Sequence, residues 1–267
     1  MPLFQLILVA LIQGITEFLP VSSSGHLILL PNLTGMEDQG QAIDVAVHVG
    51  TLAAVVLYFW KDVREGLGGL LTLACGRMDT PGAKLALGLI IATIPTVIFG
   101  AFLHFTGLSD ALRSIAVIGW TMLGFGIVLY FADQWGKTAK TVGDWGVRDA
   151  LIMGLWQMLA LIPGTSRSGI TITGARQLGY SREDGARIAM LMSIPTIIAS
   201  GLLLGMDVVK DGNSGLMRDM VIAAGLAMIS ALGALYLMMR LLRSVSFTPY
   251  VIYRVVLGVI LLVVAYS

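Results

Sequence analysis

Two short stretches of this sequence carry side chains that could do chemistry. The first, residues 13–26, reads QGITEFLPVSSSGH and brings together Glu17, three consecutive hydroxyls beginning at Ser22, and His26. A histidine can accept a proton or attack an electrophile near neutral pH, and a carboxylate can orient the histidine or hold a metal ion. The stretch therefore offers a general base and a nucleophile.

The second stretch, residues 163–169, reads PGTSRSG and centres on Arg167. Arginine suits phosphate because its guanidinium stays charged and binds two oxygens at once. The hydroxyls and backbone N–H groups of a glycine-bearing turn can complete an anion cradle at the start of the following helix. A base and a nucleophile facing an anion clamp are the parts of a phosphoryl-transfer site. The candidate cradle residues are Gly164, Thr165, Ser166, Arg167, Ser168 and Gly169.

The composition indicates the surroundings of these groups. Of the 267 residues, 57% are hydrophobic and 12% are charged, whereas an ordinary soluble domain has about 25% charged residues. We therefore predict an all-α integral membrane protein that forms a single polytopic domain, residues 1–267. The net charge of +1 indicates no nucleic-acid partner. Six stretches approach the ~20 apolar residues that a spanning helix needs: about 42–60, 84–103, 114–132, 186–206, 220–240 and 250–266.

Two further apolar segments, residues 3–31 and 149–178, are interrupted near the middle by Pro20 and Pro163, each followed by hydroxyl and glycine residues. Each half is too short to cross the bilayer. Irregular backbone survives at membrane depth only when it is buried in protein or lines a wet cavity. We therefore expect both interruptions to face one cavity, and ionisable groups buried there are functional candidates by default.

The basic residues predict the orientation, because lysine and arginine concentrate in cytoplasmic loops. Basic residues precede and follow 149–178, so this segment is predicted to enter the membrane and return to the same side. The same logic places residues 32–41 and both termini on the outer side. The predicted cytoplasmic set is Lys61, Arg64, Arg77, Lys84, Lys137, Lys140, Arg148, Arg176, Arg182, Arg187, Arg240, Arg243 and Arg254, and the outer set is Arg113, Lys210 and Arg218.

This pattern predicts two inverted-topology repeats, about 1–132 and about 147–267. Each repeat is a re-entrant helical hairpin followed by three transmembrane helices, a plan in which sites form where two broken segments meet. The alternative is eight ordinary helices, two of them kinked by proline.

Several of the candidate residues also have structural explanations. The serines could cap a helix, and Arg167 could be buried only as the partner of Glu17. Gln13 and Gln157 could satisfy backbone groups freed by the interruptions. His48 could line the cavity or pair with the carboxylate one turn earlier.

The two stretches resemble the signature motifs of the bacterial undecaprenyl-diphosphate phosphatases, also called bacitracin resistance proteins. The resemblance covers essentially the whole chain, including Tyr253, Arg254 and Gly258. It implies hydrolysis of a C55 isoprenoid diphosphate to the monophosphate in the bacterial cytoplasmic (inner) membrane, with a divalent cation, Mg²⁺ or Ca²⁺, as cofactor. The implied partners are the isoprenoid lipid and membrane lipid, and a homodimer is left open.

The resemblance assigns catalysis to Glu17, Ser23, His26 and Arg167, with Glu17 also the candidate metal ligand. His26 and Ser23 are rival nucleophiles, and Glu17 either orients His26 or binds the metal. Many family members have an acidic residue in place of Gln13, so a mechanism with two chelating carboxylates is weakened here. The competing function is a polyprenyl-phosphate translocase, a flippase, which needs an anion clamp but no nucleophile. The substrate-binding assignments are Gln13, Ser22, Ser24, Gly164, Thr165, Ser166, Ser168 and Gly169.

Overall fold

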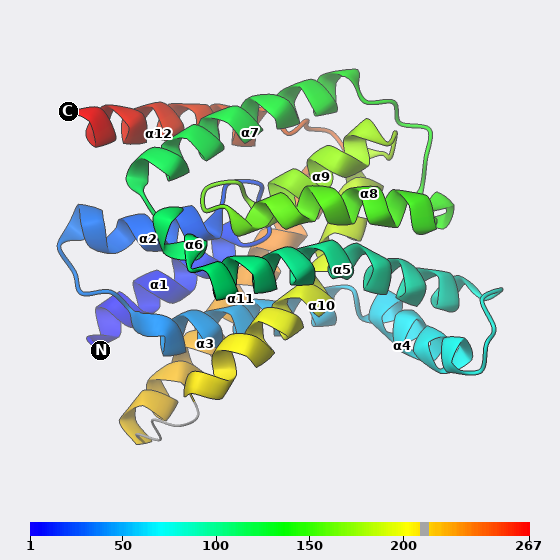
Figure 1. The fold of residues 1–267 in the computed structure, drawn as a ribbon, viewed down its shortest axis with the longest axis horizontal. Helices are drawn as coiled ribbons and strands as arrows, with labels where there is room; N and C mark the ends of the chain where they lie inside the picture. The colour runs from blue at the N-terminus through cyan, green and yellow to red at the C-terminus, as the bar shows by residue number, and fades with distance from the viewer. Residues whose placement is uncertain (209–213) are drawn as a thin grey trace.

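A computed structural model describes residues 1–208 and 214–267 of the chain. The described part is all-helical, as predicted, apart from one isolated β-bridge between Lys140 and Tyr180. In chain order (Figure 1) the elements are α1 Leu3–Thr16, α2 Ser23–Thr34, α3 Gly40–Tyr58, α4 Trp60–Ala74, α5 Pro81–Thr106, α6 Leu108–Ala111, α7 Ile115–Trp135, η1 Val142–Asp144, α8 Val147–Met158, η2 Leu159–Leu161, α9 Arg167–Gln177, α10 Arg182–Val208, α11 Ser214–Leu241 and α12 Thr248–Tyr266.

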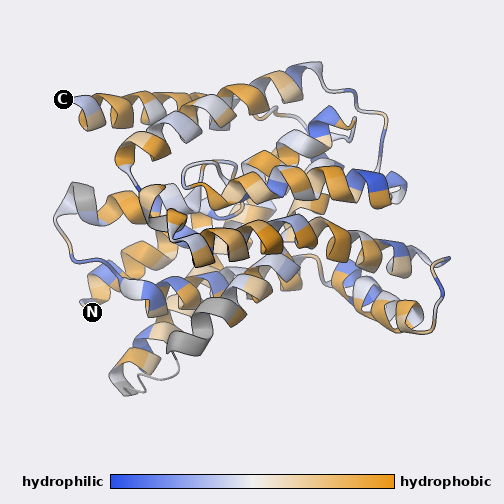
Figure 2. Ribbon diagram, viewed as in Figure 1, coloured by the Kyte–Doolittle hydropathy of each residue, from blue (hydrophilic) through white to orange (hydrophobic). Residues whose placement is uncertain are grey.

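Among the described helices, α3, α5, α7, α10, α11 and α12 are long and apolar enough to cross a membrane. These six helices match the six predicted spans. Figure 2 shows many hydrophobic residues along α5 and α12, and large apolar side chains such as Ile98, Val221 and Val263 are exposed at the bundle surface. Such surfaces are stable where lipid covers them, so the chain is a multi-pass membrane protein.

The connection between α3 and α5 contains a helix, α4, rather than the loop that its basic residues predict. Its 15 residues are too few to span a bilayer. One face packs on α5 so closely that a Cβ on Gly69 would lie 2.0 Å from the carbonyl oxygen of Gly82. The opposite face exposes Leu67 and Leu71. The charges at its start interrupt the apolar pattern, so the sequence pattern there resembles a loop.

Two pairs of short helices form hairpins, α1 with α2 and α8 with α9. They contain 14, 12, 12 and 11 residues, well below the ~20 that a spanning helix needs. Figure 1 shows the two hairpins entering the bundle from opposite ends, with their turns in its middle. The prolines and hydroxyl clusters of the sequence therefore lie at the centre of the molecule.

The two turns share one backbone conformation. Helices α2 and α9 follow the N-cap residues Ser22 and Ser166, whose φ values of 73° and 70° are uncommon for any residue with a side chain. Each cap hydroxyl accepts the N–H of a glycine three residues on, Gly25 at 3.3 Å and Gly169 at 3.2 Å. These bonds satisfy N–H groups that a helix start otherwise leaves without a partner.

Close helix packing fixes the hairpins against the spanning helices. Helix α11 packs against α1 and α3, while α5 packs against α8 and α10. A Cβ on Gly50 would lie 2.2 Å from the carbonyl oxygen of Ala224, and one on Gly154 would lie 2.5 Å from that of Ala92. Small residues at these crossings let backbones approach, as is usual between membrane helices.

Charged groups form contacts at both ends of the bundle. Both termini lie at one end (Figure 1), where the amino group of Met1 is 3.2 Å from the carboxylate of Asp219. At the other end, the carboxylate of Asp133 forms an ion pair with Arg176 at 3.2 Å and accepts a hydrogen bond from Arg182 at 2.7 Å. These bonds hold the end of α7 against the end of α9 and the start of α10.

Two of the basic residues used to predict the topology need comment. Arg254 is not part of a loop: it lies within α12 and is fully buried. The prediction was wrong because a single arginine six residues into an apolar helix resembles an end-of-span charge. Lys210 lies outside the described residues.

Candidate active site

The turns of the two hairpins contact each other directly. The hydroxyl of Ser168 donates to the carbonyl oxygen of Leu19 at 2.9 Å, which joins the start of α9 to the first turn. The guanidinium of Arg254 joins them again, donating to the carbonyl oxygens of Pro20 at 3.5 Å and Gly164 at 3.2 Å. Backbone from both halves of the chain therefore converges on one side chain of α12.

Arg254 is neutralised by backbone dipoles rather than by a carboxylate. Its guanidinium also donates to the carbonyl oxygens of Thr165, Met122 and Thr121, at 2.9, 3.2 and 3.2 Å. A buried charge is tolerated when its hydrogen-bonding groups are satisfied. The role of Arg254 here is to fasten the two turns to α7 and α12.

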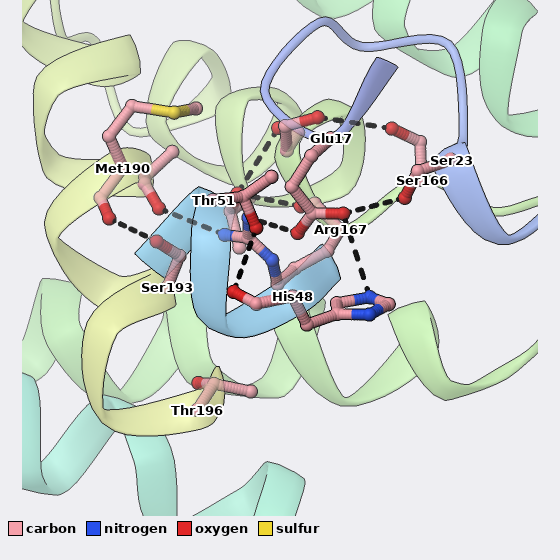
Figure 3. Close-up of polar contacts among 12 residues, drawn as sticks. Glu17, Ser23, His48, Thr51, Ser166, Arg167, Met190, Ser193 and Thr196 are labelled. Carbon is pink, nitrogen blue, oxygen red and sulfur yellow. Dashed lines mark hydrogen bonds and ion pairs between the residues drawn. The ribbon is translucent and has the colours of Figure 1, made fainter. Parts of the chain in front are cut away.

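Glu17, at the end of α1, is the centre of a polar cluster (Figure 3). One carboxylate oxygen accepts Nη2 of Arg167 at 3.0 Å. The other accepts the hydroxyl of Ser23 at 2.6 Å and the amide of Gln13 at 2.9 Å, and it lies 3.8 Å from Nε2 of His48. The first hairpin supplies the carboxylate and the hydroxyl, and the second supplies the cation.

The Glu17–Arg167 pair is largely withdrawn from solvent, with side chains 5% and 13% exposed. Arg167 also donates to the carbonyl oxygen of Ala189, at 3.4 Å. Removing one member of such a pair would strand the other, at a cost of about 3–5 kcal/mol. Arg167 is therefore the ion-pair partner of Glu17, as its structural explanation requires. Both side chains also line a cavity.

His26 points away from this cluster. Its Nδ1 lies 2.6 Å from the carbonyl oxygen of Ser22, and its Nε2 lies 2.5 Å from the hydroxyl of Tyr253. A carbonyl can only accept, so Nδ1 carries the hydrogen in the neutral ring and Nε2 accepts from Tyr253. Glu17 accordingly contacts Ser23 and not His26, which differs from the predicted pairing.

A cavity of about 490 Å³ lies beside the cluster, between α3 and α10. Of the predicted site residues, Glu17, Ser23, Ser24, Ser166 and Arg167 line it. The rest of the wall is mostly apolar, and the exposed side chains Val49, Ile198 and Leu202 show where it meets the bundle surface. The cavity thus combines a polar head with an apolar outlet.

The other predicted site residues lie behind this wall and hold it in place. Ser22 and Gly169 build the caps of the turns, Ser168 joins the hairpins, and the carbonyl of Gly164 accepts Arg254. Thr165 is fully buried, and within the described part of the chain its hydroxyl has no hydrogen-bond partner. Gln13 acts through its bond to Glu17, so it contacts a side chain and not freed backbone as predicted. His26 is likewise absent from the cavity wall.

The cavity wall also contains residues outside the set of predicted site residues. His48 lines the cavity, and its Nδ1 lies 2.7 Å from the backbone carbonyl of Asp44, which decides between its two explanations in favour of the cavity. Gln157 also lines the cavity and donates to the hydroxyls of Thr96 and Thr196, at 3.3 and 3.0 Å, rather than to freed backbone. Thr96 and Thr196 each end an Ile-Pro-Thr triplet, at residues 94–96 and 194–196, which is the one sequence feature that these two partners of Gln157 share.

The described residues do not fit a metal ion held by protein ligands alone. No group of three His, Cys, Asp or Glu side chains among them is close enough to share an ion. Glu17, the predicted ligand, has its two oxygens turned toward donors from Arg167, Ser23 and Gln13.

The fold and the site define a class: a multi-pass membrane protein with a buried carboxylate, serine and arginine grouped as phosphoryl-transfer chemistry requires. The chain belongs to the family of the bacitracin resistance protein BacA, whose model matches residues 6–260. It is 80% identical over its full length, and that of the relative, to a protein of Ruegeria sp. (strain TM1040) named undecaprenyl-diphosphatase. It is also 74% identical, again over both full lengths, to a protein of Ruegeria pomeroyi that is named undecaprenyl-diphosphatase. A protein of Rhodospirillum rubrum named undecaprenyl-diphosphatase 1 is 48% identical over all of this chain and 96% of the relative.

Proposed function

We propose that this protein is an undecaprenyl-diphosphatase, which hydrolyses a C55 isoprenoid diphosphate to the monophosphate and inorganic phosphate and so returns the lipid carrier to cell-envelope synthesis. The names of its full-length relatives support this function. The observation that carries it is the 2.6 Å hydrogen bond from Ser23 to Glu17, with Arg167 on the same carboxylate.

Ser23 is the proposed nucleophile. Its hydroxyl already donates to a carboxylate, the arrangement that activates a weak nucleophile. The Ser23 oxygen attacks the terminal phosphorus while Glu17 takes the hydroxyl proton. The bond from phosphorus to the bridging oxygen breaks, and the isoprenyl monophosphate leaves with that oxygen. A phosphoserine and a protonated Glu17 remain, so atoms and charge balance.

Arg167 and the start of α9 are proposed to bind the diphosphate. A guanidinium can hold two phosphoryl oxygens and stabilise charge that spreads over them in the transition state. The incoming phosphate competes with Glu17 for Arg167. This competition frees the carboxylate to act as a base on Ser23.

His26 is proposed as a positioning residue for this nucleophile. Its ring binds the carbonyl of Ser22, the residue in the uncommon left-handed conformation directly before Ser23. Tyr253 occupies the other ring nitrogen. The imidazole thus stabilises the turn from which the nucleophile projects, and its loss would let the turn relax.

The isoprenoid tail is proposed to leave the cavity between α3 and α10. Val49, Ile198 and Leu202 are apolar, line the cavity and are exposed at the surface of the bundle. A tail in this outlet reaches lipid without crossing a polar layer, while the diphosphate stays at Arg167.

For the membrane arrangement we propose two inverted repeats in one domain, about 1–132 and about 147–267, each a re-entrant hairpin with three spanning helices. In this arrangement α1 corresponds to α8, α3 to α10 and α5 to α11. The contacts agree with this correspondence: α11 packs against α1 and α3, and its counterpart α5 packs against α8 and α10. The common φ values of Ser22 and Ser166 support the same pairing. The end that carries both termini is proposed as the outer side of the bacterial inner membrane.

The divalent cation that the family resemblance implies is proposed to arrive with the diphosphate. Magnesium is often bound through substrate phosphates and one or two carboxylates rather than by a protein cage. Glu17 is the carboxylate nearest the proposed nucleophile. A homodimer likewise remains a proposal.

The test is phosphate release from C55 diphosphate by the purified protein in detergent. We expect Ser23→Ala to lower turnover about 10⁴-fold and Arg167→Ala about 10²- to 10³-fold. Near-normal release by Ser23→Ala would disprove the assigned nucleophile. A flippase without phosphatase activity would release no phosphate even as wild type, since detergent leaves no second compartment.

A further inference from the structure

Gln157, on α8, is a fully buried glutamine that lines the cavity, and its carbonyl oxygen has no hydrogen-bond partner among the described residues. Its amide nitrogen donates to the hydroxyls of Thr96 on α5 and Thr196 on α10. A buried acceptor without a donor costs free energy, so such a group calls for an explanation. The mechanism proposed above makes no use of it.

The orientation of this amide follows from its neighbours. The hydroxyl of Thr196 donates its hydrogen to the carbonyl oxygen of Met192, at 3.0 Å, so it can only accept a hydrogen bond from Gln157. The nitrogen end must therefore face Thr196, and the carbonyl oxygen faces away from it. Thr96 accepts from Gln157 but has no acceptor for its own hydrogen among the described contacts. Gln157 and Thr96 both line the cavity, so its wall contains a buried acceptor without a partner next to a hydroxyl whose hydrogen has no acceptor among the described contacts.

The reaction supplies only one partner that suits this pair of groups. An ionised diphosphate presents acceptor oxygens only, so a carbonyl oxygen repels it. Water is the second substrate of a hydrolase, and it can donate to Gln157 while accepting from Thr96. A polar pocket with two to four partners is what holds an ordered water.

We propose that Gln157 and Thr96 hold the water molecule that hydrolyses the phosphoserine. This inference rests on the proposed function, because it requires the Ser23 intermediate. In the step, the water oxygen bonds to phosphorus as the bond to the Ser23 oxygen breaks. Glu17 returns its proton to Ser23, and the product leaves as dihydrogen phosphate, so the serine and the carboxylate regain their starting states. Gln157 thereby becomes a positioning residue for the second half of the reaction.

The alternative is that Gln157 merely ties α5, α8 and α10 together. Gln157→Met keeps the length of the side chain and removes both the tie and the carbonyl. Thr96→Val removes the water's other partner. Thr196→Val removes the tie to α10 but leaves the carbonyl, so it serves as the matched comparison.

The experiment uses purified protein in detergent and C55 diphosphate labelled with ³²P on the terminal phosphate. Acid quenching at short times measures labelled protein and released monophosphate. We expect Gln157→Met to release about one monophosphate per protein at the wild-type rate, to accumulate labelled protein, and then to turn over about 100-fold more slowly. Thr96→Val should behave similarly in a weaker form, whereas Thr196→Val should accumulate no more label than wild type.

The outcomes separate the two proposals. Ser23-dependent label in wild type, without extra accumulation in Gln157→Met or Thr96→Val, would overturn the water site and leave the proposed function intact. The water site is also overturned if Thr196→Val accumulates as much label as Gln157→Met, because the tie alone would then explain the effect. Absence of label from every variant, together with full activity of Ser23→Ala, would defeat the covalent route and the water site with it. If Gln157→Met does not fold, Thr96→Val carries the test.

Discussion

Two turns of the molecule have the same backbone arrangement: residues 22–25 and residues 166–169. Both have a capping serine in a left-handed conformation, and both close on a glycine N–H. They differ in the residue after the cap, which is Ser23 in one and Arg167 in the other. One frame therefore presents a hydroxyl, its counterpart presents a cation, and both reach the single carboxylate of Glu17.

This difference shows that the backbone of each turn positions a side chain beside Glu17, and that the residue after the capping serine determines the chemistry of that side chain. A serine at positive φ is strained, and such strain persists only where surrounding contacts enforce it. In both turns a second hydroxyl lies near the cap oxygen: Ser24 is 3.4 Å from Ser22, and Ser168 is 3.2 Å from Ser166. The two turns share these supporting contacts, and they differ in the side chain that each presents to Glu17.

Loss of the link between the turns should have the largest effect. We expect Arg254→Met to destabilise the protein by about 3–5 kcal/mol, because several buried carbonyl oxygens lose their donor together. Thermal unfolding in detergent measures this. The control is Arg77→Met, because Arg77 is exposed and its one ion pair within the described residues is with Asp79. Equal melting temperatures for the two variants would show that the turns stay together without the guanidinium.

The cation of the second turn should tolerate no simple replacement. Arg167→Lys keeps the charge but loses the two-pronged geometry, so we expect turnover to fall about 10- to 100-fold with folding retained. The phosphate-release assay and a melting curve test this together. Wild-type turnover in Arg167→Lys would mean that charge alone suffices at this turn.

The first turn should depend on a residue that the second lacks, since Ile170 stands where His26 would be. Tyr253→Phe removes the bond that orients the histidine, so we expect kcat to fall about tenfold, as for a hydrogen bond of ~1.4 kcal/mol, with KM unchanged. Tyr266→Phe on the same helix is the control, since its hydroxyl accepts a hydrogen bond from Trp120 and has no other such bond to the described residues. A change in KM alone would place Tyr253 in substrate binding instead.

The caps should respond alike in both turns. We expect Ser22→Ala and Ser166→Ala to cost about 1 kcal/mol each, while the corresponding glycine variants cost only a few tenths, because glycine adopts positive φ freely. Urea or thermal titration of the four proteins would measure this. A large difference between the two alanine variants would break the equivalence of the turns.

Chelation of divalent cations should have the smallest effect on stability. With no group of three metal-ligating side chains among the described residues, we expect EDTA to leave the melting temperature of the substrate-free protein unchanged. Phosphate release is expected to fall in the same buffer and to return with added Mg²⁺. A marked drop in melting temperature would reveal a resident ion.

Much of this arrangement was predictable from sequence, because it depends on patterns that sequence records. Apolar length predicted the six spans, and a polar motif inside an apolar segment predicted the place of Glu17, Ser23 and Arg167. The missed features depend on backbone geometry. Carbonyl oxygens carry no residue-specific signal, so neither the bonds of Arg254 nor the bond from His26 to Ser22 could be read from residue types.

The bonds of Arg254 also limit how the molecule can move. A carrier that rocks one half against the other must separate its two central turns in every cycle. Here that movement would pull a buried cation away from Pro20 on one side and from Gly164 and Thr165 on the other. The two central turns are thus held together, and a substrate would reach them without their separating.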